Sequence, residues 1–117
     1  MARDPERPML RHIVWAGVLV AAALAAGDAG AADALAGKKK AAVCAVCHGL
    51  NGIATNPDAP NLAGDNVNYI IKQLHAFQSG ARQQEQMTIV AKDLTEDDIA
   101  NLAAWYSGLK VTVEMPQ

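Results

Sequence analysis

The chain is poor in cysteine, in aromatic residues and in net charge, and each shortage excludes a class of protein. Only two of the 117 residues are cysteine, too few for a scaffold stapled by several disulfides. The net charge is −2, whereas a nucleic-acid-binding domain presents a strongly basic surface, so no nucleic-acid partner is expected. Aromatic residues make up 4% of the sequence, which leaves little side-chain mass for a core in so small a domain. The composition therefore fits a fold that encloses a large apolar group.

The N-terminal segment has the three parts of an export signal. Three arginines within the first 11 residues precede an uncharged apolar run of 14 residues, 13–26, and small residues follow at 29–31. A membrane-spanning helix needs about 20 apolar residues, so cleavage is favoured over retention and no stable membrane span is expected. We therefore predict a signal peptide over 1–32, export of the protein, and one domain over 33–117. Retention of the segment as an uncleaved anchor is the alternative.

Both cysteines of the chain lie in one short motif, Cys44-Ala45-Val46-Cys47-His48. A Cys-x-x-Cys-His sequence is typical of covalent haem attachment. Each thiol adds across a vinyl group of the haem, and the adjoining histidine binds the iron from one face. The two-residue spacing places both sulfurs on one side of a helical turn. The motif therefore predicts one covalently bound haem with His48 as its proximal ligand.

Two other interpretations of a Cys-x-x-Cys pair are a thioredoxin-like redox site and half of a zinc site. A zinc site needs four ligands, and the chain outside the motif offers only His12 and His75 as further histidines and no further cysteine. A redox dithiol usually opens a helix that follows a strand, and no strand is predicted before Cys44. A Cys44–Cys47 disulfide would close a very short loop and restrict the unfolded chain little.

The remaining pattern predicts an all-α domain of three to four helices with long loops. Glycine, proline and asparagine mark residues 49–65 as a loop, and residues 81–86 as a second, polar one. Thr95 followed by Asp98 resembles a capping box at the start of the last helix. Gly37 within the first helix indicates either close packing against another element or a tolerated glycine. The expected helices cover 34–43, 66–78, 87–92 and 95–108.

The spacing alone leaves three candidates for the second axial ligand of the iron: His75, Met87 and Met115. His75 lies on a different side of its helix from the apolar stripe, and Met115 lies in a terminal tail. Met87 follows a loop and precedes the last helix, where a thioether can reach the far face of a ring, although it also suits a gap in the core. The identity of this second ligand determines the chemistry of the haem, because an iron with an open axial position would bind other ligands.

Residues 37–109 resemble class I cytochromes c, and in particular the small periplasmic bacterial type. The matching pieces occur in the order found in that family. They are the attachment motif with Gly49, the loop 59–64, the segment 69–82, Met87 with Thr88, and the terminal segment 102–106. The resemblance implies a class I cytochrome c-like fold around one haem c, attached covalently through two thioethers.

The resemblance also implies roles for four further residues. Met87 stands at the place of the distal iron ligand, and Pro60 at the place of a proline whose carbonyl accepts a hydrogen bond from the proximal histidine. Gly37 and Trp105 stand where the first and last helices of the family cross, with Trp105 replacing the more usual tyrosine or phenylalanine. With the three motif residues included, five residues are expected to bind the haem: Cys44, Cys47, His48, Pro60 and Met87.

Three side chains have less specific assignments. Arg82 and Lys72 are cations that either pair with a haem propionate or remain solvated on the surface, and a guanidinium suits a carboxylate better than an ammonium does. Tyr69 is either a wall of the haem pocket or an ordinary core aromatic.

The resemblance implies a periplasmic electron-transfer protein, not an enzyme. With His48 and Met87 both bound, the iron has no vacant position and only cycles between Fe(II) and Fe(III). The expected partners of this monomer are redox proteins, such as a quinol–cytochrome c reductase and a terminal oxidase. The alternatives are a haem-bearing subunit of a larger membrane or periplasmic oxidoreductase complex, a ligand-binding or peroxidatic haem protein, and a thiol–disulfide exchange protein.

Overall fold

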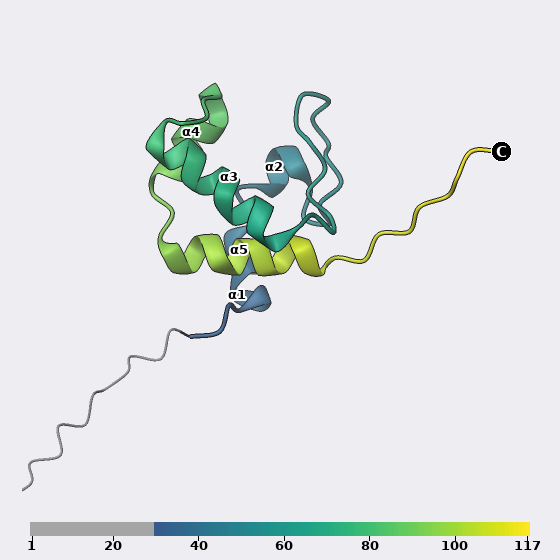
Figure 1. Ribbon diagram of the computed structural model, residues 1–117, viewed down its shortest axis with the longest axis horizontal. Coiled ribbons are helices and arrows are strands. Elements are labelled where there is room, and N and C mark those ends of the chain that lie inside the picture. The colour runs from purple at the N-terminus through teal and green to yellow at the C-terminus, as the bar shows by residue number, and fades with distance from the viewer. Residues whose placement is uncertain (1–29) are drawn as a thin grey trace, which may run out of the picture.

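Five helices and the loops between them make up the domain (Figure 1). The computed structural model describes residues 30–117, and no strand occurs within that range. The prediction of an all-α domain is confirmed. The helices are α1 (Ala34–Lys40), α2 (Ala45–His48), α3 (Val67–Ser79), α4 (Glu85–Lys92) and α5 (Glu96–Gly108).

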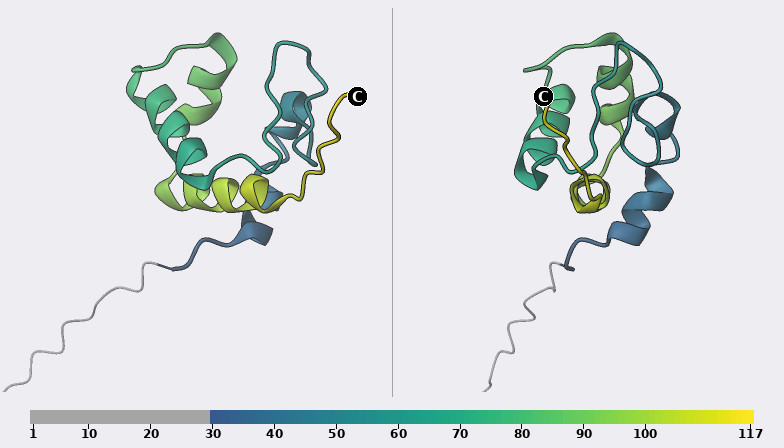
Figure 2. Two further views of the ribbon diagram at one scale, coloured as in Figure 1. Left: turned by 45° about the vertical axis from the view of Figure 1, so that its right-hand side comes forward. Right: turned by 90° about the vertical axis from the view of Figure 1, so that its right-hand side faces the viewer.

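The last helix, α5, is the element against which the others are organised. It packs against both α1 and α3, and α3 in turn packs against α4. In Figure 2, α5 runs between α1 below it and the other elements above it, with α3 and α4 rising at one end and α2 with the 49–65 loop at the other. Its inward stripe supplies four of the buried core side chains: Ile99, Leu102, Ala103 and Tyr106.

The start of α5 is fixed by the predicted capping box. The Thr95 hydroxyl accepts a hydrogen bond from the Asp98 backbone N–H at 3.1 Å, and the Asp98 carboxylate accepts one from the Thr95 N–H at 3.0 Å. Two of the N–H groups that a helix start leaves unpaired are satisfied in this way. The same carboxylate lies 2.9 Å from Lys40 Nζ, so that it also ties α1 to α5.

Gly37 allows α1 and α5 to cross in contact. A Cβ atom at this position would overlap the backbone carbonyl of Asn101 and lie 3.0 Å from the Cβ of Trp105. Of the two interpretations of this glycine, close packing against another element is therefore confirmed. The crossing also brings Lys38 Nζ to 5.4 Å from the centre of the Trp105 ring, a cation–π arrangement.

The ends of α3 and α4 follow ordinary capping chemistry. The side chain of Asn66 accepts hydrogen bonds from the first turn of α3, and Gly80 ends that helix in the left-handed conformation, with φ of 78°. Glycine adopts this conformation without the steric cost of a Cβ. The Gln84 side chain accepts from Met87 N at 2.8 Å and caps α4, which begins two residues earlier than predicted.

Two further differences from the sequence-based expectations concern the attachment motif and the N-terminus. The motif residues form a short helix of their own, α2, so the domain has five helices instead of three to four. The predicted signal peptide, 1–32, falls almost entirely on residues 1–29, which lie outside the described residues. Within 30–117, no helix is both long enough and apolar enough to cross a bilayer.

Candidate haem site

A cavity of about 670 Å³ opens between the motif, α3, α4 and α5. Its volume lies within the range of roughly 300–1,000 Å³ that is usual for cofactor pockets. The residues that line it come from the motif, the 49–65 loop, α3, α4, the segments on either side of α4, and α5. Most of the lining is apolar, including Leu62, Ile70, Leu74, Phe77, Val90, Leu94 and Leu102.

Both motif cysteines line this cavity, and neither is in a disulfide. Burial raises the pKa of the Cys44 thiol, and a backbone hydrogen bond and the nearby Lys40 only partly oppose this effect. The Cys47 sulfur is 3.9 Å from the side-chain amide of Asn56. A half-buried thiol with a raised pKa is a poor redox nucleophile, which disfavours the thiol–disulfide exchange alternative.

His48 is buried, with 7% of its surface exposed, and its ring is held by the 49–65 loop. The Nδ1 atom lies 2.8 Å from the carbonyl oxygen of Pro60. Because a carbonyl oxygen can only accept, Nδ1 must carry the proton, and the neutral ring then has its free lone pair on Nε2. This is the tautomer that a histidine needs to bind a metal through Nε2, and the hydrogen bond raises its basicity.

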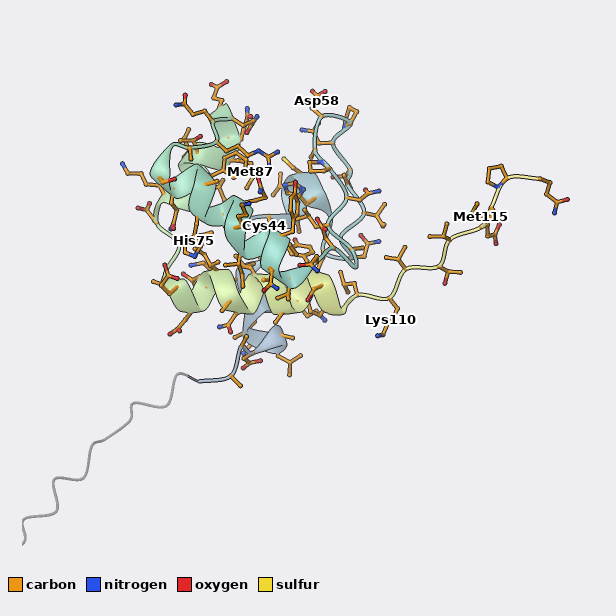
Figure 3. The ribbon with its side chains drawn as sticks, viewed as in Figure 1. Cys44, Asp58, His75, Met87, Lys110 and Met115 are labelled. Atoms are coloured by element: carbon orange, nitrogen blue, oxygen red, sulfur yellow. The ribbon has the colours of Figure 1, made fainter. Side chains whose placement is uncertain are left out.

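Of the three candidates for a second axial ligand, only Met87 lines the cavity. The half-buried Met87 side chain also packs against the hydrophobic core, so that it contacts both the core and the cavity. His75 Nε2 is 3.3 Å from the Glu96 carboxylate at the start of α5, and Met115 is 80% exposed. Figure 3 places Met87 and Cys44 in the centre of the domain, His75 beside α5, and Met115 on the extended C-terminal tail.

Two aromatic side chains of α5 hold the residues that follow His48. The hydroxyl of Tyr106 donates to the carbonyl of Gly49 at 3.3 Å, and Trp105 Nε1 donates to the carbonyl of Leu50 at 3.1 Å. Burial raises the pKa of Tyr106 to about 12, with a further contribution from the charge of a Cys44 thiolate. A thioether carries no charge, so that this second contribution disappears once Cys44 is alkylated.

The residues around the cavity fit a haem and do not fit zinc. The cavity brings together two thiols, a buried histidine with Nε2 free, a thioether and a largely apolar wall. Within residues 30–117 no cluster of three or more His, Cys, Asp or Glu side chains is placed to hold a metal ion, whereas a structural zinc needs four such ligands. The zinc alternative is therefore wrong for the described part of the chain.

The comparison with known proteins agrees with this donor set. The family model described as "Cytochrome c" matches residues 34–110, which contain the motif, the loop, and all of α3, α4 and α5. The chain belongs to the cytochrome c family. The cofactor of that family is a covalently attached haem c, and the Cys44/Cys47 pair followed by His48 is its attachment sequence here.

Two relatives and one solved structure show how far the similarity extends. Cytochrome c4 of Pseudomonas aeruginosa is 41% identical over 85 residues, covering 73% of this chain and 42% of the relative. Cytochrome c-554(548) of Halomonas halodenitrificans is 39% identical over 80 residues, covering 66% of this chain and 96% of the relative. The crystal structure of reduced recombinant cytochrome c4 from Pseudomonas stutzeri has a TM-score of 0.65 at 36% identity, covering 71% of this chain and 48% of that one.

These matches confirm the class I cytochrome c-like fold predicted from the sequence. The chain spans about half the length of the cytochrome c4 relatives it matches, and nearly the whole length of cytochrome c-554(548). Every predicted haem-binding residue lines the one cavity: Cys44, Cys47, His48, Pro60 and Met87. Lys72, the weaker of the two cation candidates, does not line it, whereas Arg82 and Tyr69 do.

No pattern in the sequence indicates several of the polar contacts around the site. Gln73 and Arg82 are nine positions apart, yet a hydrogen bond joins their side chains because the chain reverses at Gly80. The hydrogen bonds from α5 to Gly49 and Leu50 span more than fifty positions and depend on how α5 docks. The periodicity of apolar residues predicts which face of a helix is buried, but it does not predict a contact that tertiary packing creates.

Proposed function

We propose that this protein is a single-electron carrier that uses one haem c. Cys44 and Cys47 would hold the haem through thioethers, and His48 and Met87 would bind the iron from its two faces. The observation that carries the proposal is the shared cavity: buried His48, oriented by the Pro60 carbonyl, and Met87, the only candidate distal ligand there, line it together with both cysteines.

When bound, the haem supplies a couple between Fe(II) and Fe(III) that changes by one electron. The side chains of this protein set the energy of that couple and restrict other reactions. A histidine and a methionine in the axial positions leave no coordination site for a substrate, and the soft thioether favours the reduced state and a higher potential. For this reason we propose a carrier, not an enzyme.

The proposed setting is the periplasm. The charge and hydropathy pattern of residues 1–32 supports export. The mature protein would begin near residue 33 and would be a monomer. Its partners would be redox proteins such as a quinol–cytochrome c reductase and a terminal oxidase. Encounters of this kind bury small interfaces and are weak and short-lived. Mass determination of the purified periplasmic protein tests both the cleavage site and the covalent haem.

A redox titration followed by visible spectroscopy tests the proposed function. The native protein should show one reversible one-electron couple and a spectrum of low-spin, six-coordinate haem in both oxidation states. Carbon monoxide added to the reduced protein should bind slowly or not at all, because Met87 occupies the distal position. Rapid stoichiometric binding would instead support a ligand-binding or peroxidatic protein. Haem that is lost on denaturation would contradict covalent attachment.

A further inference from the structure

Arg82 is the single side chain with a permanent positive charge among those that line the cavity. The other titratable side chains facing the cavity are His48 and the two cysteines of the motif, Asp58 and Asp65 of the loop, Tyr69 of α3 and Tyr106 of α5, and α4 contributes none. A haem brings two propionate carboxylates to this site. Because the lining residues already include two aspartates, the site with haem bound needs a cation.

The guanidinium of Arg82 is held in place by α3. After Gly80 turns the chain, Arg82 N donates to the carbonyl of Ala76 at 3.0 Å, which directs the side chain back along the helix. Its guanidinium carbon lies 4.7 Å from the centre of the Phe77 ring, and Nη1 donates to Gln73 Oε1 at 2.7 Å. Two contacts thus order a side chain that is otherwise costly to immobilise.

The guanidinium keeps most of its hydrogen-bonding capacity. A guanidinium has five N–H donors, and Gln73 is the only side-chain acceptor that Arg82 has among residues 30–117. The salt bridges of that part of the chain join Lys40 to Asp98 and His75 to Glu96, so no protein carboxylate is paired with Arg82. An ordered guanidinium fork with free donors at the rim of an apolar cavity is suited to a carboxylate.

We propose that Arg82, held by Gln73 and Phe77, pairs through its guanidinium fork with a haem propionate and so keeps the midpoint potential high. This inference rests on the proposed function. A propionate charge near the iron favours the ferric state, and the guanidinium neutralises it. The same pairing stabilises the ionised propionate, so that its pKa stays low. The potential of the native protein should then change little from about pH 5 to about pH 8.

Potentiometry of the purified holoprotein over this pH range tests the proposal, with Arg82→Gln and Lys72→Gln as a matched pair. Both side chains are exposed and both variants remove one positive charge near α3, but Arg82 lines the cavity and Lys72 does not. We expect Arg82→Gln to lower the potential at neutral pH severalfold more than Lys72→Gln does. The difference in potential between Arg82→Gln and the native protein should narrow as the pH falls. The reason is that a propionate without its guanidinium partner takes up a proton at a higher pH than a paired propionate does. Equal shifts in the two variants would overturn the proposal.

Arg82→Lys keeps the charge and removes the fork, so its potential should lie between those of the native protein and Arg82→Gln. A potential equal to that of the native protein would overturn pairing through the fork. This variant decides the question if Arg82→Gln does not accumulate as holoprotein. The proposed function fails separately: a native protein that lacks a reversible couple, or that binds carbon monoxide rapidly, would contradict electron transfer whatever the Arg82 variants do.

Discussion

The Nδ1 atom of His48 lies 2.8 Å from the carbonyl oxygen of Pro60, twelve positions further along the chain. This contact links the short helix α2, which contains Cys47, to the loop that lines the cavity beside it. It also selects the tautomer with Nε2 free, so a backbone atom determines which ring nitrogen is available to the iron.

Pro60→Gly should raise the midpoint potential modestly and lower the thermal stability. Proline fixes φ and so holds its own carbonyl in place, and a looser carbonyl makes a weaker hydrogen bond and a less basic imidazole. A less basic ligand stabilises Fe(III) less. Pro60→Ala is the control, because alanine retains the carbonyl with less added freedom, and its potential should lie closer to that of the native protein. A fall in potential in Pro60→Gly would contradict the assigned role.

Met87→Ala should lower the midpoint potential and allow carbon monoxide to bind the reduced protein rapidly. Removal of the thioether opens the distal position and takes away the donor that favours Fe(II). Stopped-flow mixing with carbon monoxide measures the first effect and potentiometry the second. Met115→Ala serves as the control, since Met115 is exposed on the C-terminal tail. If Met87→Ala binds carbon monoxide no faster than the native protein, Met87 is not the axial ligand.

Gly37→Ala should destabilise the protein by about 1–3 kcal/mol, the usual cost of inserting a methyl group into a packed contact. The added Cβ would overlap the carbonyl of Asn101, which belongs to the backbone and cannot move aside without shifting α5. Gly108→Ala is the matched control: that glycine is also helical, has no positive φ, and has open space around its Cβ position. It should be neutral or stabilising by up to about 1 kcal/mol. Urea unfolding of the oxidised proteins measures both.

Asp98→Asn should lower the free energy of unfolding by about 0.5–1 kcal/mol at neutral pH. The hydrogen bond from the Thr95 backbone N–H, and then Lys40, hold the pKa of Asp98 below its ordinary value of 3.8. A carboxylate with a depressed pKa in the folded state stabilises the fold above its unfolded pKa and loses that effect as the pH falls through the folded value. The difference between the two proteins should therefore be constant above about pH 5 and vanish in stronger acid.

Asp97→Asn provides the comparison, since it removes a charge from the same helical turn but breaks neither the capping box nor the ion pair with Lys40. Its effect should be smaller than that of Asp98→Asn at neutral pH. If the two variants lose the same stability, the helix dipole alone accounts for the effect and the specific contacts of Asp98 contribute nothing.

The sequence predicted those parts of the site that depend on local pattern. The Cys-x-x-Cys-His spacing, the Thr95 cap and the glycine at the end of α3 each depend on chemistry within a few residues, and each is found where expected. A helical turn at the motif was expected from the cysteine spacing, but its assignment as a separate helix, α2, was not predicted, because four residues are too few to show a period. The helix α4 starts two residues early, since a glutamine side chain, not one of the usual short polar residues, caps it.

Spacing could not decide between His75, Met87 and Met115, because the choice depends on which side chain faces the cavity once the helices pack. The family resemblance favoured Met87, and the packing then places only that residue against the cavity. The sequence also left both Lys72 and Arg82 as candidate partners of a propionate, with only the better match of a guanidinium to a carboxylate in favour of Arg82. What separates them is the reversal of the chain at Gly80, which returns Arg82 along α3 to Gln73.

The two hydrogen bonds from Trp105 and Tyr106 to the residues after His48 have a consequence for biogenesis. Their donors lie in α5, more than fifty positions after their acceptors, Leu50 and Gly49, which follow the motif directly. Until α5 docks, the segment with Cys44 and Cys47 lacks these restraints, and Cys44 lacks part of the core that half-buries it. The docking of the C-terminal helix would therefore close the period in which haem can be attached.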